Sequence, residues 1–171
     1  HGGAIGIIVG LYFFSRKQKK PFIWILDRIV IVVALGGFFI RTGNLMNSEF
    51  FGDITTLPWG FYFIRYYEPS YGLDPRHPTQ IYEALSYFLI FVFLLRYYWA
   101  HNGNPRPGML FGFFLVMVWS VRFLIEFIKL PQVGFEEGML LNMGQWLSIP
   151  FILLGIGSML WTRKGTMQST A

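Results

Sequence analysis

Residues 22–52 read FIWILDRIVIVVALGGFFIRTGNLMNSEFFG, in which an apolar run over residues 22–40 leads directly into a polar cluster that begins at Arg41. The apolar run has the length that crosses a bilayer, where each buried charge costs on the order of 2.5–3.5 kcal/mol. If the helix continues, then Arg41, Asn44 and Ser48 share one face, with Asn47 beside them. A snorkelling arginine followed by helix-capping asparagines would explain any one of these residues. Four together, ending in Glu49 and Gly52, predict a functional site facing a protein interior.

The composition is that of a membrane protein. The chain has 171 residues, of which 54% are hydrophobic and only 13% charged, whereas a soluble domain averages about 25% charged residues. The net charge is +5, but the basic residues cluster between apolar runs, as at bilayer surfaces, so we expect the lipid bilayer and no nucleic acid as a partner. The chain has no cysteine. Any thiol chemistry therefore uses the thiol of a partner.

Further apolar segments predict an all-α polytopic membrane protein of about five transmembrane helices. The segment at residues 2–14 is shorter than the ~20 residues that a full span needs, so it predicts a truncated or re-entrant span. Because the first residue is His1 and not Met, we expect the chain to begin partway through a longer protein, with residues 1–171 forming a single membrane-embedded domain. The other expected spans lie at residues 22–40, 81–99, 108–128 and 142–162.

The charges in the connecting turns predict one orientation in the membrane. Basic residues without neighbouring acids mark the cytoplasmic side by the positive-inside rule: Arg16, Lys17, Lys19, Lys20, Arg96, Arg106, Arg163 and Lys164. The acidic residues fall in the other turns, so the Arg41 cluster is expected at the extracytoplasmic leaflet. The loop at residues 50–76 lies on the same side, and its aromatic content predicts a small extracytoplasmic cap on the membrane surface.

A second polar group lies in the fourth expected span. Arg122, Glu126 and Lys129 follow at i, i+4 and i+7, on one face of one helix. An internal ion pair would explain Arg122 and Glu126 alone, but it leaves an excess of positive charge. With Arg41 on the same side of the membrane, two or three cations would converge on one anion, for which a lipid phosphate is the natural candidate.

Histidine and the carboxylates suggest proton transfer rather than metal binding. His1 and His77 are candidate proton-transfer groups, although a lone histidine is more often structural. The carboxylates are scattered and no histidine-rich spacing occurs, so we expect neither a metal site nor a cofactor. No nucleotide-binding or serine-nucleophile motif occurs either.

Several segments together resemble the bacterial prolipoprotein diacylglyceryl transferase family. The resemblance is collinear, spans nearly the whole chain, and is most specific in the second of its segments: His1-Gly2-Gly3, residues 41–52 (RTGNLMNSEFFG), residues 76–83 (RHPTQIYE), Arg122 to Glu126, and residues 143–150 (MGQWLSIP). It implies a multi-pass enzyme of the bacterial inner membrane. Such an enzyme moves the diacylglyceryl group of phosphatidylglycerol onto the lipobox cysteine of a prolipoprotein signal peptide, releasing glycerol phosphate and leaving a thioether.

The resemblance also implies roles for individual residues. His1 would handle a proton, Arg41 and Arg122 would hold the phosphate, and Glu126 would orient Arg122. Contacts to substrate or to the motif around it are implied for a larger set: Asn44, Asn47, Glu49, Gly52, His77, Gln80, Glu83, Glu126 and Lys129. The chain departs from the family pattern at Lys129, where an arginine is frequent, and at Val118, where a tyrosine is common.

Two other classes of function also fit a cationic cavity in a membrane. A transporter or lipid-binding protein would use the cavity without chemistry, but transporters favour midplane sites and internal repeats, and this sequence shows no repeat. A purely structural membrane subunit is the third possibility. It predicts that Arg41→Ala and Arg122→Ala leave function in cells unchanged.

Overall fold

The computed structural model describes residues 2–65, 74–129 and 141–167, and the regular elements within these ranges are all helical. The elements are α1 (Gly2–Gln18), α2 (Phe22–Asn47), α3 (Thr79–Ala100), α4 (Met109–Ile125), the single 3₁₀ turn η1 (Glu126–Ile128) and α5 (Met143–Met167). The expected all-α architecture is confirmed. In the described ranges, four helical segments are long and apolar enough to cross a membrane: Phe22–Asn47, Thr79–Ala100, Met109–Ile128 and Met143–Trp161. The remaining expected span corresponds to α1, which has 17 residues.

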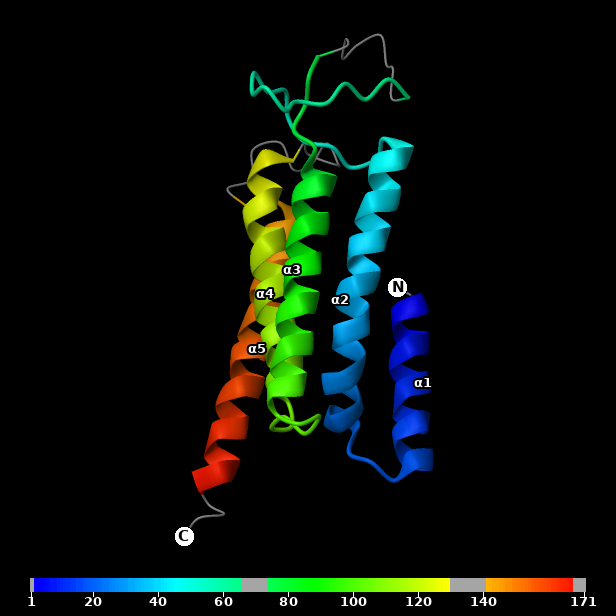
Figure 1. Cartoon of the computed structure of the whole chain (residues 1–171), viewed down its shortest axis with the longest axis vertical. Coiled ribbons are helices and arrows are strands. Elements are labelled where there is room, and N and C mark those ends of the chain that lie inside the picture. The colour runs from blue at the N-terminus through cyan, green and yellow to red at the C-terminus, as the bar shows by residue number, and fades with distance from the viewer. Residues whose placement is uncertain (1, 66–73, 130–140, 168–171) are drawn as a thin grey trace.

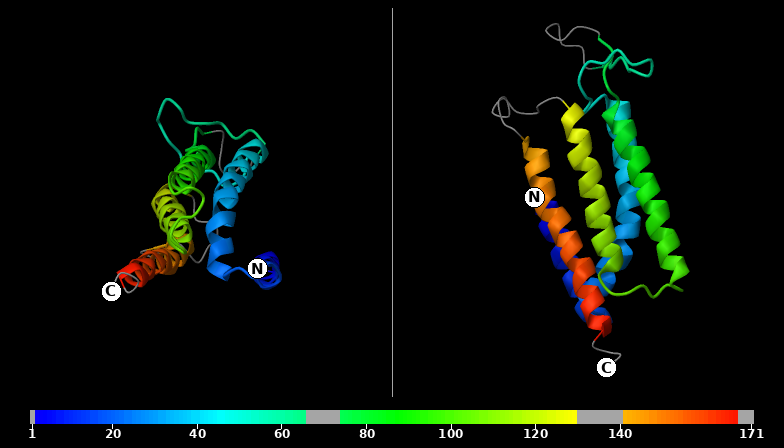
Figure 2. Two further views of the ribbon diagram at one scale, coloured as in Figure 1. Left: turned by 60° about the horizontal axis from the view of Figure 1, so that its bottom comes forward. Right: turned by 90° about the vertical axis from the view of Figure 1, so that its left-hand side faces the viewer.

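The helices α2 to α5 stand side by side, and α1 lies outside them against α2 (Figure 1). The turns between α1 and α2 and between α3 and α4 lie at one end, which we call the basic end. The end of α2 and the start of α3 lie at the opposite end, which we call the loop end. Figure 2 shows the same arrangement from two further directions. The alternation of basic and acidic turns along the sequence therefore corresponds to two ends of one bundle.

The core lies where α2, α3 and α4 meet. Its buried members are Val30, Ile31, Ala34, Tyr87, Ile90, Leu94 and Leu110. α5 packs on α4 through two glycines, since an added Cβ at Gly112 would lie 2.8 Å from the Gly155 carbonyl oxygen and one at Gly155 would lie 2.9 Å from the Gly112 oxygen. Close backbone approach of this kind is typical of helix pairs in membranes.

Asp27 and Arg28 lie near the start of α2, where the sequence suggests that their charges reach water or each other. That expectation is wrong for Asp27, whose side chain is buried (1% exposed) and accepts hydrogen bonds from the backbone N–H groups of Gly108 (2.6 Å) and Phe111 (2.8 Å). The first N–H groups of a helix have no partner within it, so a carboxylate from a neighbouring helix is a suitable acceptor. Arg28 stacks over the Trp24 ring (3.5 Å) and donates to the Gly103 carbonyl.

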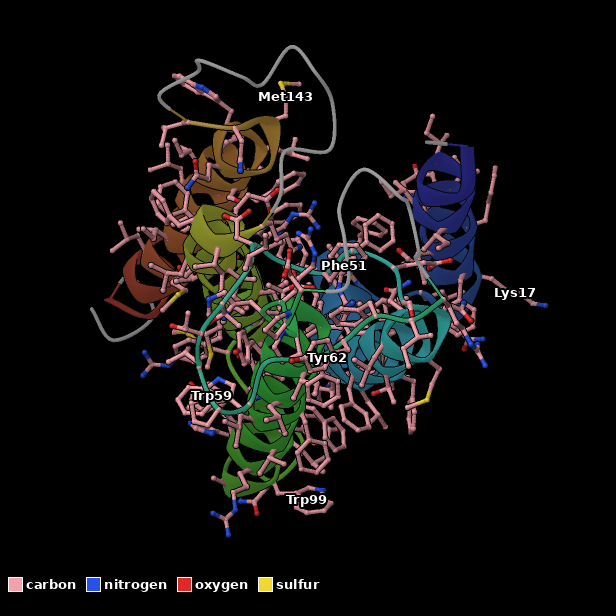
Figure 3. The ribbon with its side chains drawn as sticks, turned by 90° about the horizontal axis from the view of Figure 1, so that it is seen from above. Lys17, Phe51, Trp59, Tyr62, Trp99 and Met143 are labelled. Carbon is pink, nitrogen blue, oxygen red and sulfur yellow. The ribbon has the colours of Figure 1, made fainter. Side chains whose placement is uncertain are left out.

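Aromatic side chains organise the described parts of the loop between α2 and α3. Phe51 is buried and stacks on Phe63, with ring centroids 4.9 Å apart. Seen from above, Phe51 lies over the interior of the bundle and Trp59 lies toward its edge (Figure 3). The Trp59 indole N–H donates to the hydroxyl of Tyr82 in the first turn of α3 (3.0 Å). This hydrogen bond ties the loop to the bundle, whereas its position on a membrane surface stays a prediction.

Candidate functional site

The carboxylate of Glu83 is the centre of a buried charge cluster at the loop end. One of its oxygens lies 2.7 Å from Arg41 Nε and the other 2.8 Å from Lys129 Nζ. The side chain of Glu83 is fully buried, and those of Lys129 and Arg41 are 3% and 15% exposed. Arg41 and Lys129, two of the three cations expected to converge on a lipid phosphate, thus converge on the carboxylate of Glu83. A buried carboxylate is far less costly when it is paired in this way.

The end of α2 presents the polar stripe predicted from the sequence. Arg41 Nη1 lies 3.4 Å from Asn44 Oδ1, and Asn44 Nδ2 donates to a Glu49 carboxylate oxygen at 2.9 Å. Asn47 is exposed at the last position of the helix. The helix ends because Ser48 adopts a left-handed conformation (φ 58°), which turns Glu49 back toward Asn44. Ser48 therefore does not extend the helical face that carries Arg41.

The first turn of α3 is bonded to the chain that leaves α2. Thr79 Oγ1 donates to the Phe50 carbonyl (2.7 Å) and Gln80 Nε2 donates to the Glu49 carbonyl (2.5 Å). Both side chains are fully buried. Gln80 and Glu83 are three residues apart, so they lie on the same face of α3. Gln80 therefore holds the end of the Arg41 motif beside the carboxylate that pairs with Arg41.

Gly52 lies where three parts of the chain approach one another closely. Its N–H donates to the His77 carbonyl (2.9 Å), and the next N–H, of Asp53, donates to the Ile128 carbonyl (3.0 Å). A Cβ at residue 52 would collide with that Ile128 oxygen and would lie 2.8 Å from a Thr79 methyl carbon. Gly52 also forms an isolated bridge with Lys129. Its role in the structure is close packing that brings Lys129 to Glu83.

The residues after α4 differ from the continuous helix expected there. The α-helix ends at Ile125, Glu126 begins a 3₁₀ turn, and Lys129 is extended (φ −90°, ψ 146°). Lys129 therefore leaves the helical face of Arg122. Its Nζ lies 2.8 Å from a carboxylate oxygen of Glu83 and 3.8 Å from one of Glu126. Among the described residues Arg122 forms no ion pair with Glu126, so the contact expected to orient Arg122 is not formed. The guanidinium lies over the Trp119 ring instead, 5.7 Å from its centroid.

Glu126 is positioned by the start of α5. Its backbone carbonyl accepts a hydrogen bond from Asn142 Nδ2 (3.2 Å). A Cβ on Gly144 would lie 2.5 Å from the carboxyl carbon of Glu126, so only glycine leaves room for the carboxylate there. The N-terminal turn of a helix favours a negative charge, which suits this position.

Tyr87 and Gly144 belong to the site but were not expected as site residues. Tyr87 is buried one turn after Glu83 on α3, where the charges of Glu83, Arg41 and Arg122 act on its hydroxyl. A Cβ at Gly37 would lie 2.9 Å from the Tyr87 ring, so α2 approaches α3 closely beside Arg41. The spacing of Gln80, Glu83 and Tyr87 at i, i+3 and i+7 is the signal that could have identified Tyr87. Gly144 has no comparable sequence signal, because its role depends on a contact between helices.

Of the two histidines expected at the site, His77 lies within the described residues. The ring of His77 is half-buried, and its Nδ1 lies 3.4 Å from the Tyr82 hydroxyl, which also accepts from Trp59. His77 thus joins the aromatic contacts of the loop. His1 lies outside the described residues, so its expected role in proton handling stays a prediction.

The described charges of this cluster have an excess of one positive charge. Three cations, Arg41, Arg122 and Lys129, accompany two buried carboxylates, Glu83 and Glu126. Within the described ranges, Arg122 forms no ion pair, and its buried Nε has no hydrogen-bond partner. Arg122 is therefore the cation of the cluster that no described carboxylate pairs with, and its Nε donor is left for an added anion.

Comparisons with a family model and with individual relatives point to the same protein family. The family model described as prolipoprotein diacylglyceryl transferase matches residues 1–161. Relatives named phosphatidylglycerol–prolipoprotein diacylglyceryl transferase include those of Tolumonas auensis (46% identical over 96% of this chain), Bacteroides fragilis (41% over 96%) and Vibrio cholerae (37% over 96%). The chain spans 62%, 57% and 58% of the lengths of these three relatives.

Proposed function

Because the chain belongs to the prolipoprotein diacylglyceryl transferase family, we propose that the protein transfers the diacylglyceryl group of phosphatidylglycerol to the lipobox cysteine of prolipoproteins. This is the first step of bacterial lipoprotein maturation, and the protein would act in the cytoplasmic (inner) membrane. The loop end would face the extracytoplasmic leaflet, because the basic turns gather at the other end. A signal peptide that has crossed the membrane would meet the lipid there.

The observation that carries the proposal is the excess positive charge around Glu83 and Arg122. In the reaction the cysteine sulfur forms a bond to the terminal glyceryl carbon of the diacylglyceryl group. The bond between that carbon and the phosphate oxygen breaks, and glycerol phosphate leaves with an additional negative charge. Donors placed where this charge develops lower the barrier, and each one is worth about 2.7–4 kcal/mol in comparable sites.

Arg122 would bind the phosphate directly, since among the described residues no carboxylate pairs with its guanidinium and its Nε has no hydrogen-bond partner. Arg41 would bind the same phosphate with the nitrogen atoms that do not face Glu83. Glu83 would hold Arg41 and Lys129 in place rather than touch the lipid, because each of its oxygens lies in an ion pair with one of these cations and its side chain is fully buried. The thiol proton would go to a base, for which family resemblance favours His1.

The proposal is tested with the protein from its complete reading frame, reconstituted in bilayers containing phosphatidylglycerol. A synthetic lipobox peptide is added, and its mass is measured. We expect the mass of one diacylglyceryl group on the cysteine, and no gain on a peptide with serine at that position. A peptide that stays unmodified while the protein is folded and binds phosphatidylglycerol would favour the lipid-binding or transport alternative. Bilayers of phosphatidylethanolamine alone serve as the lipid control.

A further inference from the structure

Asp27 is a buried carboxylate at the basic end, far along α2 from the charge cluster. Its two oxygens accept from the N–H groups of Gly108 and Phe111, at 2.6 and 2.8 Å. Gly108 is the N-cap residue of α4 and lies in a left-handed conformation (φ 88°). A glycine has no side chain to bond the first N–H groups of its helix, where Ser, Thr, Asp or Asn normally does so. Asp27 provides that cap from α2.

The same glycine is also bonded from α5. The Ser158 hydroxyl donates to the Gly108 carbonyl at 2.8 Å. The turn before Gly108 is held as well, because Arg28 Nη2 donates to the Gly103 carbonyl at 3.0 Å. Side chains of α2 and α5 thus meet the backbone at the start of α4. We call this set of contacts around Gly108 the basic-end joint.

The spacing from this joint to the two arginines is equal on the two helices. Arg41 follows Asp27 by 14 residues on α2, and Arg122 follows Gly108 by 14 residues on α4. Both helices run from the basic end to the loop end (Figure 1). At the helical rise per residue, each arginine stands about 21 Å above the joint. Fourteen residues make nearly four helical turns, so each arginine lies on nearly the same side of its helix as the residue that takes part in the joint.

We infer that Asp27 is a positioning residue that sets the heights of Arg41 and Arg122 relative to each other. The buried residues of α2 between Asp27 and Arg41 are Val30, Ile31 and Ala34, and the partly buried Phe38 packs against the same core, so packed side chains lead from the joint to the turn before Arg41. Arg41 pairs with Glu83, and Arg122 lies in the last turn of α4 just before Glu126, so both arginines border the charge cluster at the loop end. The consequence for catalysis rests on the proposed function, whereas the alignment of the helices does not.

The alignment is measured by pulsed electron paramagnetic resonance on the complete protein in nanodiscs. Because this chain has no cysteine, spin labels are placed at Ile40→Cys on α2 and Leu124→Cys on α4, both of which are exposed. The distance between labels is compared for Asp27, Asp27→Asn and Asp27→Ala. Rates of diacylglyceryl transfer are measured on unlabelled proteins with the same residue 27. Leu94→Ala, which removes a fully buried side chain of α3 that makes none of the hydrogen bonds of the joint, is the control for general destabilisation.

We expect Asp27→Ala to shift or broaden the distance by about 1.5 Å or more, one residue of helical rise, and to lower the transfer rate roughly tenfold or more. Asp27→Asn keeps one acceptor oxygen, so its label distance and its transfer rate should lie between those of the unaltered protein and those of Asp27→Ala. Leu94→Ala should leave the distance unchanged. An unchanged distance in both Asp27 variants overturns the inference, whatever the rate does. If the Asp27 variants shift the distance but neither they nor the unaltered protein show measurable transfer, the result supports the alignment and contradicts the proposed function. If Asp27→Ala does not fold, Asp27→Asn alone decides by the same criteria.

Discussion

Glu83 binds Arg41 and Lys129 with opposite oxygens of one carboxylate, at 2.7 and 2.8 Å. Arg41 comes from the end of α2, Glu83 from the start of α3, and Lys129 from the chain after α4. One buried carboxylate therefore joins three parts of the chain at the loop end. Contacts within the protein hold these positive charges in place, as preorganised electrostatic stabilisation of a phosphate under the proposed function requires.

Replacing Glu83 by Gln should destabilise the protein strongly. Two cations would lose their counter-charge in a buried place, and breaking a buried ion pair typically costs about 3–5 kcal/mol. Thermal unfolding in detergent measures the change. The double variant Glu83→Gln, Lys129→Met removes one of the stranded charges, so it should be more stable than Glu83→Gln alone. A double variant that loses the sum of the two single effects would show that the pair is not coupled.

Gly52→Ala should destabilise the protein by about 1–3 kcal/mol, the usual cost of overpacking. The added methyl group would collide with the Ile128 carbonyl and crowd Thr79 and His77. Gly43→Ala is a matched control in the same motif, because a Cβ there meets nothing within 4 Å. Gly43 lies inside α2, where alanine is favoured by up to about 1 kcal/mol. Equal unfolding temperatures for the two variants would contradict this explanation of Gly52.

Gly144→Ala should displace the Glu126 carboxylate, since its methyl group would occupy the place of the carboxyl oxygens. We expect a loss of about 1–3 kcal/mol in stability, measured by thermal unfolding. Gly157→Ala on the same helix, where a Cβ meets nothing within 4 Å, should have little effect. The loss should shrink when Gly144→Ala is combined with Glu126→Ala. If it stays the same size there, Glu126 is not the group that requires glycine.

Much of the fold could be predicted from the sequence because hydropathy and turn charge report directly on the bilayer. The spans at residues 22–40, 81–99, 108–128 and 142–162 correspond to α2 to α5, and the basic turns lie together at one end of the bundle. The polar stripe of Arg41 and Asn44 was also predictable, since it depends only on helical spacing. These features are local, or depend on contact with lipid rather than on contact between helices.

The pairing within the site could not be predicted in the same way. Helical spacing favours a contact between Arg122 and Glu126, but the change to a 3₁₀ turn at Glu126 releases Lys129 toward Glu83 on another helix. Asp27 looked like a residue close to water because it stands near the end of a span. It is buried because α4 begins with a glycine that needs an acceptor from outside. Both outcomes depend on how helices meet, which spacing along one helix does not report.

The proposed function depends on Arg41 and Arg122 binding one phosphate, which is tested by the rate of a single transfer turnover. The rate is compared for the unaltered protein, Arg41→Ala, Arg122→Ala and the double variant, each in bilayers saturated with phosphatidylglycerol. Each single change should lower the rate by roughly 100- to 1,000-fold, as removal of one charge-stabilising donor does elsewhere. If both arginines act on one phosphate, their effects are not independent, and the double variant should be within about threefold of the slower single variant. A double variant whose loss equals the product of the two single losses, or an Arg122→Ala protein with full rate, would show that the two arginines do not act on one phosphate.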